Sequence, residues 1–270
     1  MNYRPTRFSY LPEVVKNLLI INGLFFLATF VMGTSLDLDL VKHLGLHNWQ
    51  SPDFRPHQLV THLFMHGGIG HIFFNMFALW MFGNQLENVW GGKRFLTYFM
   101  ITGLGAAALH LGVNQLQIYF LEIKFSSEYL SFIKEVGYDF WIEFKELKKQ
   151  YEKGIPPTLI AELMNKYGLT ADLNTFKLIQ QYHTPTVGAS GAVFGVLLAF
   201  GMLFPNTLIY IYFALPIKAK YFVMIYGAFE LWSGIQNNPG DNVAHFAHLG
   251  GMIFGYFLIK YWRKNSQHFY

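Results

Sequence analysis

The sequence predicts an all-α, polytopic membrane protein whose chain crosses the bilayer six times. Of its 270 residues, 53% are hydrophobic and only 13% are charged, whereas soluble domains usually carry about 25% charged residues. Aromatic residues make up 19% of the chain, which suits side chains that face lipid and its interfaces. The net charge of +4 comes from basic residues that flank apolar runs. We therefore expect a lipid bilayer around this chain and no nucleic-acid partner.

Six apolar runs approach the roughly 20 residues that a helix needs to cross the hydrocarbon core. They are Val14–Met32, His71–Val89, Phe95–Tyr119, Val187–Phe204, Tyr221–Trp232 and Val243–Trp262. The fifth run is the weakest, because Pro216 interrupts the apolar segment in front of it. The first run lacks the small-residue cleavage site of a signal peptide, so it is expected to be a span.

Lysine and arginine residues predict the orientation, because short basic loops stay in the cytoplasm. Such residues precede the first span, follow the sixth, and lie in the second-to-third and fourth-to-fifth loops. In a six-span chain all these segments fall on one side, so both termini are expected in the cytoplasm. We expect an integral, multi-pass protein of a bacterial cell (inner) membrane.

The polar segment 121–182 is expected to form a helical extramembrane insert between the third and fourth spans. The flanking residues 1–120 and 183–270 would then form the transmembrane domain. Within the insert, apolar residues recur every three or four positions over Glu128–Lys153, which is the pattern of an amphipathic helix. The favoured interpretation is a small helical unit packed on the outer surface, and a substrate-handling lid or partner site is the alternative.

Ser190 lies among glycines and alanines in the sequence TVGASGAVFG, where the fourth span begins. Small residues around a serine usually serve helix packing, but a serine becomes a nucleophile where a base takes its proton. His248 in the sixth span is a candidate base, because ionisable residues inside a membrane are costly and often functional. Glycines four apart on both spans would let the helices approach and bring the two side chains together. These glycines are Gly191, Gly195, Gly251 and Gly255.

His71 and Asn75 are four residues apart, so in a helix both project from one face. Each offers a hydrogen-bond donor, and neither carries a fixed negative charge. Donors of this kind stabilise the oxyanion that forms during acyl transfer. The backbone N–H of Ser190, at a helix start where amides lack partners, would complete an oxyanion hole.

A row of histidines offers a different interpretation, because imidazole binds zinc. The row consists of His57, His62, His66 and His71. No carboxylate or thiolate joins it, and the sequence GGIG is expected to break the helix between the last two members. We therefore expect no metal and no cofactor. A transporter with a histidine proton relay is a distant alternative, since relays usually include carboxylates, and Glu87 and Glu230 are the only ones in the predicted spans.

Three motifs resemble those of the rhomboid intramembrane serine proteases. They are G-x-S-G at Gly188–Gly191, A-H-x-x-G at Ala247–Gly251 and H-x-x-x-x-H-x-x-x-N at His66–Asn75. They fall on the predicted fourth, sixth and second spans, and the resemblance covers all six spans but not the insert. It implies a rhomboid-like bundle of six transmembrane helices.

The resemblance also implies roles for individual residues. Ser190 would be the nucleophile and His248 the general base. His71 and Asn75 would stabilise the oxyanion, and Glu87 would be a structural hydrogen-bonding residue. The implied function is a serine endopeptidase that cleaves the transmembrane segments of other membrane proteins, which are its expected partners. A non-catalytic rhomboid-like protein that binds or escorts membrane proteins is the alternative.

The chain departs from the family pattern near the proposed base. Phe194 stands where some members carry a tyrosine stacked on the histidine, and a phenyl ring can still stack there. His245 competes with His248 for the role of base, but it lacks the x-x-G continuation. No carboxylate is evident to orient His248, and Asp241 is only a weak candidate for a third member.

Overall fold

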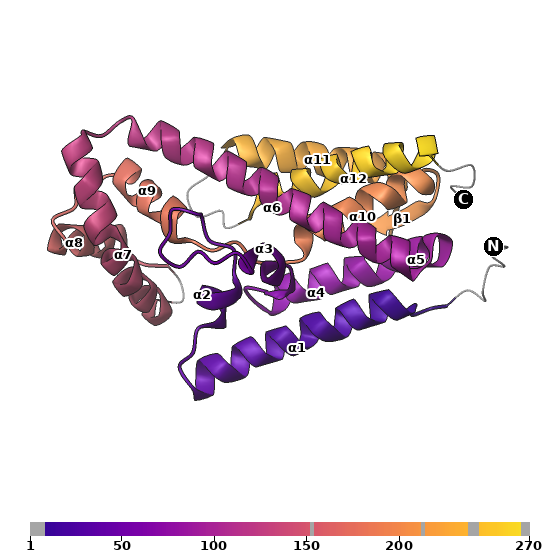
Figure 1. Ribbon diagram of the computed structural model, residues 1–270, viewed down its shortest axis with the longest axis horizontal. Helices are drawn as coiled ribbons and strands as arrows, with labels where there is room; N and C mark the ends of the chain where they lie inside the picture. Colours follow the sequence, from indigo (N-terminus) through magenta and orange to yellow (C-terminus); the bar gives the residue numbers. More distant parts are fainter. Residues whose placement is uncertain (1–8, 152–153, 212–213, 237–242, 266–270) are drawn as a thin grey trace. The chain divides into compact units, whose positions relative to one another are not determined.

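The computed structural model describes four stretches of the chain, residues 9–151, 154–211, 214–236 and 243–265. Helices dominate these residues, and a two-stranded sheet accompanies them. Figure 1 shows the helices along the chain from α1 to α12.

The chain divides into two compact units. The first, called the bundle here, comprises residues 1–46, 56–110 and 186–270. The second, called the insert unit, comprises residues 47–55 and 111–185. The insert unit therefore includes a short segment from the first half of the chain, which sequence periodicity alone did not associate with it.

The bundle is built mainly from helices. In chain order they are α1 (Glu13–Ser35), α2 (Leu40–Leu44), α3 (Gln58–Thr61), the 3-10 turn η1 (His62–Phe64), α4 (Ile69–Ala78), the π-helical turn η2 (Leu79–Gly83), α5 (Asn84–Trp90), the first part of α6 (Gly92–Glu122), α10 (Ser190–Leu203), α11 (Ala219–Gln236) and α12 (His245–Asn265). Every predicted span coincides mainly with helical residues. The second predicted span is divided into α4, η2 and α5, and α4 begins at Ile69, after Gly67 and Gly68, so the expected break between His66 and His71 is present.

Two of the predicted spans differ from the observed elements. The fourth begins three residues later than predicted, at Ser190, because Gly188 adopts a φ of 125° that a helix does not accommodate. The apolar residues before the fifth span form an antiparallel hairpin of β1 (Leu208–Ile211) and β2 (Leu215–Lys218) instead of extending a helix. Pro216 lies in β2, opposite Tyr210.

Length and composition alone mark α1 and α6, among the described helices, as able to cross a membrane, and α10 is a shorter apolar helix. The helices α11 and α12 carry ionisable side chains within apolar surroundings, namely Glu230, His245 and His248. The crossing of the membrane by all six helical segments therefore stays a prediction.

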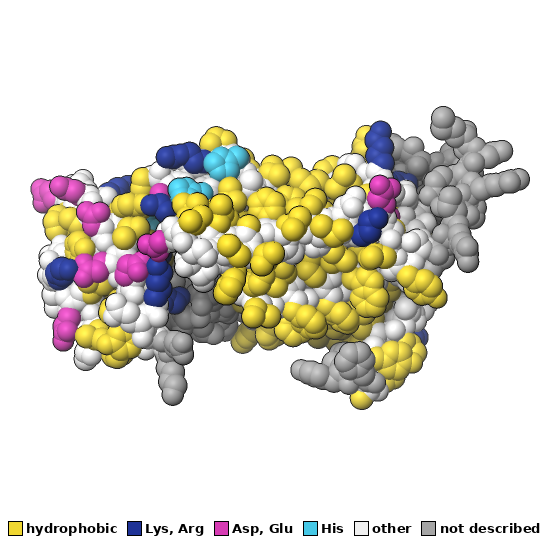
Figure 2. All heavy atoms as spheres, turned by 90° about the horizontal axis from the view of Figure 1, so that it is seen from below, with side chains coloured by type: hydrophobic (Ala, Val, Ile, Leu, Met, Phe, Trp, Pro, Cys, Tyr) yellow, Lys and Arg dark blue, Asp and Glu magenta, His cyan; other side chains and the backbone are white. Residues whose placement is uncertain are grey.

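The surface of the bundle is unusually apolar. Large hydrophobic side chains are exposed along α1, including Leu24, Leu27 and Phe30, and on α4, including Phe73 and Phe74. On the face that Figure 2 displays, hydrophobic side chains form a broad field across the centre of the view, with charged side chains gathered to either side of it. Apolar surface of this extent is rare on soluble monomers and marks contact with a protein or a membrane.

Helices α10 and α12 approach each other closely along their glycines. A Cβ atom added at Gly251 would overlap the carbonyl oxygen of Gly191, and one added at Gly255 would overlap the hydroxyl of Tyr98. Tyr98 fills the neighbouring space and donates a 2.9 Å hydrogen bond to the carbonyl of Gly195. The predicted contact of the two glycine faces is confirmed at Gly191 and Gly251, whereas Gly195 and Gly255 lie against Thr102 and Tyr98 of α6.

Glu87 ties α5 to the start of α1. Its two carboxylate oxygens accept hydrogen bonds from the backbone amides of Val14 at 2.9 Å and Val15 at 2.8 Å. Amides in the first turn of a helix have no partner within the helix, so this buried carboxylate acts as a tertiary cap. Its contacts are those of a structural residue.

The insert unit has a hydrophobic core of its own. Its helices are α7 (Ser127–Gln150), α8 (Pro157–Lys166) and α9 (Leu173–His183). Ser126 caps α7 and Asp172 caps α9 through side-chain oxygens that accept backbone N–H groups. The apolar stripe of α7 is buried against α9, with Ile133, Phe140, Leu178 and Ile179 at the centre. The predicted amphipathic helix in this segment is confirmed.

Candidate active site

Ser190 is the first residue of α10, and the turn in front of it requires glycine. Gly188 adopts a φ of 125°, and a Cβ atom there would lie 2.7 Å from His71 Nε2. Its backbone N–H donates a 2.9 Å hydrogen bond to the carbonyl of His62. The turn therefore holds the start of α10 against two segments of the bundle and places His71 beside the residues that precede the serine.

Ser190 and His248 form a hydrogen-bonded pair. Ser190 Oγ lies 2.9 Å from His248 Nε2, across the contact between α10 and α12. The ring of Phe194, one turn after the serine, stacks on the imidazole with centroids 4.1 Å apart and planes 6° apart. The stacking expected of this phenyl ring is thus observed, and it restricts the orientation of the imidazole.

Glu230 on α11 contacts both histidines of α12. Its Oε2 atom accepts hydrogen bonds from His248 Nδ1 at 2.8 Å and from His245 Nδ1 at 2.7 Å. All three side chains are buried. The expectation that no carboxylate orients His248 is therefore wrong, and Asp241, the weak candidate, lies outside the described residues.

The carboxylate of Glu230 determines which imidazole nitrogen carries the proton. An ionised carboxylate only accepts hydrogen bonds, so His248 must donate through Nδ1–H. The lone pair of Nε2 then faces Ser190 Oγ, which is the tautomer that a general base needs. Both histidines contact Glu230, but it is His248 whose Nε2 lies 2.9 Å from Ser190 Oγ, and this geometry favours His248 as the base.

His71 and Asn75 lie in α4, as the sequence predicts. Asn75 is buried, and its side-chain Nδ2 has no hydrogen-bond partner within the described part of the chain. Buried donors are normally paired, so this amide is available to a group that enters the site. The imidazole of His71 lies near Gly188. A Cβ atom added at Gly188 would also lie 3.5 Å from Ser190 Oγ.

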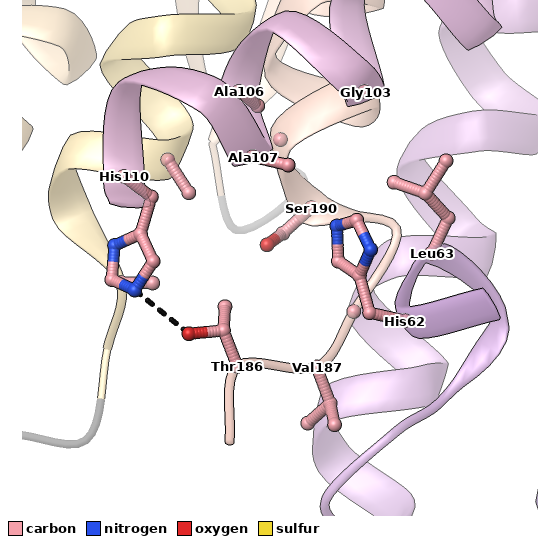
Figure 3. Close-up of a pocket in the computed structure, with 13 residues that line it drawn as sticks. His62, Leu63, Gly103, Ala106, Ala107, His110, Thr186, Val187 and Ser190 are labelled. Carbon is pink, nitrogen blue, oxygen red and sulfur yellow. Dashed lines mark hydrogen bonds between the residues drawn. The ribbon is translucent and has the colours of Figure 1, made fainter. Parts of the chain in front are cut away.

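A small pocket adjoins Ser190. Figure 3 shows the Ser190 side chain directed into it, between His62 and His110. His110 Nε2 and Thr186 Oγ1 are 2.7 Å apart on its wall. The cavity volume is about 10 Å³, close to the space that a single water molecule needs. Polar groups next to the serine thus border a space of the size of one water.

The row of histidines does not gather around a common point. His57 Nε2 lies 3.0 Å from the carbonyl of His43, and His62 Nδ1 lies 2.8 Å from that of Gln58. Among the described residues, the group of side chains that brings three metal-ligating atoms together is instead Glu230, His245 and His248.

Comparison with known families agrees with this architecture. A sequence model of the rhomboid domain matches residues 53–123 and 159–265. These two stretches contain Ser190, Glu230 and His248 and cover most of the chain. The chain therefore belongs to the rhomboid family, which is a family of membrane proteins.

Two curated relatives are distant. RHOMBOID-like protein 12, mitochondrial, from Arabidopsis thaliana is 24% identical over 244 residues, which are 88% of this chain and 55% of that protein. An uncharacterised mitochondrial rhomboid protein from Schizosaccharomyces pombe is 26% identical over 216 residues, which are 77% of this chain and 52% of that protein. The chain spans about half the length of these relatives. Both have mitochondrial names, so they do not support the expected bacterial membrane.

Proposed function

We propose that this rhomboid-family chain is an intramembrane serine endopeptidase that cleaves the transmembrane segments of other membrane proteins. The observation that carries the proposal is the hydrogen-bonded line from Ser190 Oγ through both nitrogens of His248 to Glu230 Oε2. A serine used only for packing needs neither an oriented imidazole nor a carboxylate behind it. The same three roles define serine hydrolases on unrelated folds.

In the acylation step, Ser190 Oγ attacks the carbonyl carbon of the scissile peptide while its proton passes to His248 Nε2. Glu230 stabilises the imidazolium that results, because its carboxylate already accepts the Nδ1–H hydrogen bond. The C–N bond then breaks, and the leaving amine takes the proton from Nε2. An acyl ester on Ser190 remains.

The tetrahedral intermediate carries negative charge on the former carbonyl oxygen. His71, Asn75 and the backbone N–H of Ser190 would donate hydrogen bonds to this oxygen, a role to which the unpaired Nδ2 of Asn75 lends support. Deacylation repeats the chemistry with water as the nucleophile and His248 as its base. The small pocket beside Ser190 has room for such a water.

A direct test is cleavage of single-span model substrates in proteoliposomes, with products identified by mass spectrometry. The wild type should cut at least one substrate within its apolar segment, and Ser190→Ala should cut none. Substrates that bind both proteins equally but are cut by neither would favour the non-catalytic, substrate-binding alternative.

The proposed topology places six spans in the membrane with both termini on the cytoplasmic side. The insert then lies on the opposite side from the loop between α10 and α11. Because the native chain has no cysteine, single cysteines at Lys149 and Lys218 report this directly. In sealed vesicles they should react with an impermeant thiol reagent from opposite sides. Reaction of both from one side would contradict the six-span arrangement.

A further inference from the structure

Glu230, His245 and His248 form a cluster whose chemistry goes beyond orientation of a base. One ligand atom from each residue lies within 4.8 Å of the other two. Glu230 Oε2 lies 2.7 Å from Nδ1 of His245 and 2.8 Å from Nδ1 of His248, and the side chains of both histidines are only 10% exposed. Two imidazoles and one carboxylate constitute a common donor set for protein-bound zinc.

We propose that this cluster is an inhibitory site for a divalent cation of the zinc type, which switches off the Ser190–His248 pair when it binds. The inhibition rests on the proposed function, whereas binding of the cation does not. The cation would be held by Glu230 from α11 and by two histidines one turn apart at the start of α12. The hydrogen bonds of 2.7 and 2.8 Å hold the three side chains close together.

The inhibition follows from the tautomer of His248. In the metal-free state Nδ1 carries the proton and Nε2 offers a lone pair to Ser190. A metal ion needs the lone pair of Nδ1, so the proton must move from Nδ1 to Nε2, with no net change in proton number. Nε2–H then donates to Ser190 Oγ and can no longer accept its proton. The serine stays protonated and unreactive.

His245 has a role in the proposed cation site but none in orienting His248 as the base. Its Nδ1 atom contacts the same carboxylate oxygen as His248 does, but it has no step in the proposed peptide cleavage. A second imidazole on the orienting carboxylate is unnecessary for catalysis. As the third ligand of a cation, it has a defined role.

The test uses the full-length protein in detergent and two readouts. Co²⁺, a spectroscopic substitute for Zn²⁺, reports binding through its visible absorption, without any need for activity. Labelling of Ser190 by a fluorophosphonate, measured for each variant with and without Zn²⁺, reports inhibition. We expect Zn²⁺ to lower wild-type labelling at least about tenfold and a chelator to restore it. His245→Gln should weaken both effects by about 10–100-fold or more, since even supporting residues of metal sites contribute this much.

His43→Gln is the matched control, because His43 is an exposed histidine in α2 and should leave both readouts unchanged. Wild-type Co²⁺ spectra and zinc inhibition in His245→Gln would overturn the proposal. So would inhibition by Zn²⁺ without a Co²⁺ spectrum. If Co²⁺ binds through His245 but no variant is labelled even without metal, the cation site stands and the proposed protease function fails.

Discussion

Glu230 Oε2 lies 2.8 Å from His248 Nδ1, on the opposite edge of the imidazole from Ser190 Oγ. The contact joins α11 to α12 and turns a serine–histidine pair into a line of three groups. It fixes the imidazole tautomer and provides a counter-charge for the imidazolium. A carboxylate inside a bundle of apolar helices is costly, and its contacts with both histidines offset that cost.

Glu230→Gln should lower kcat by about 10²–10⁴-fold and leave KM nearly unchanged. Glutamine keeps the shape but provides no counter-charge, and its amide can donate to Nδ1 and select the wrong tautomer, an effect worth about 10⁴-fold in a serine protease. Single-turnover cleavage and melting temperature should be measured together. A normal kcat, or a loss explained entirely by unfolding, would remove Glu230 from the mechanism.

Asn75→Ala and His71→Ala should each lower turnover by about 10–10³-fold, the usual effect of losing one oxyanion donor. Fluorophosphonate labelling of Ser190 should fall less than peptide cleavage, because the nucleophile and its base remain intact. A chelator should not reduce the activity of either variant or of the wild type. Activity that disappears in chelator and returns with Zn²⁺ would instead indicate a catalytic metal.

Gly251→Ala should destabilise the bundle by several kcal/mol and abolish cleavage. The added methyl group would overlap the carbonyl oxygen of Gly191, and overpacking of a rigid core typically costs about 1–3 kcal/mol or more. Gly23→Ala in α1 is the matched control, since no atom lies within 4 Å of its Cβ position. That control should gain up to about 1 kcal/mol from helix propensity. Similar melting temperatures for the two variants would contradict the close helix contact.

The insert unit should lose stability at acidic pH because of His183. Burial lowers the pKa of His183 from 6.5 to about 4, while the charge of Asp53 opposes the shift and His47 adds to it. The unfolded chain binds a proton that the folded unit excludes, so stability is fully present above about pH 6.5 and is lost as the pH falls through about 4. The free energy of unfolding of the insert unit falls by about 3 kcal/mol at most.

Limited proteolysis of the full-length protein between pH 7 and 4 measures this effect on α7 to α9. His183→Phe should flatten the pH dependence, because a phenyl ring has no proton to exclude and can keep the edge contact with Tyr138, 5.4 Å between centroids. An unchanged pH profile in this variant would assign the effect to other groups.

Sequence patterns located the helices through local spacing, and they located the Ser190–His248 pair, although its members are 58 residues apart, through glycines spaced along each of the two helices. The glycine faces lie at fixed intervals along α10 and α12, and a helix converts such intervals into a surface. Glu230 was missed because its contacts with His245 and His248 join two different helices, α11 and α12, and no periodicity within one helix encodes such a contact. The one available signal was a glutamate inside an apolar run.

The hairpin of β1 and β2 was missed for a related reason. An apolar run of that length fits a strand or a helix, and the cross-strand pairing that decides between them is a tertiary contact. The late start of α10 follows from the backbone conformation of Gly188. Glycine can adopt this conformation, but the presence of a glycine does not by itself predict it.

The most direct measurement is fluorophosphonate labelling of the purified protein in metal-free buffer, with the modified residue identified by peptide mass spectrometry. We expect the label on Ser190 in the wild type, background labelling in Ser190→Ala and in His248→Ala, and substantial labelling in His245→Ala. The double variant of Ser190 and His248 should be no worse at cleavage than either single variant, since the pair acts as a unit. Labelling that survives in His248→Ala and disappears in His245→Ala would contradict the assignment of the base. A wild-type protein that is folded but unlabelled at Ser190 would contradict the central claim.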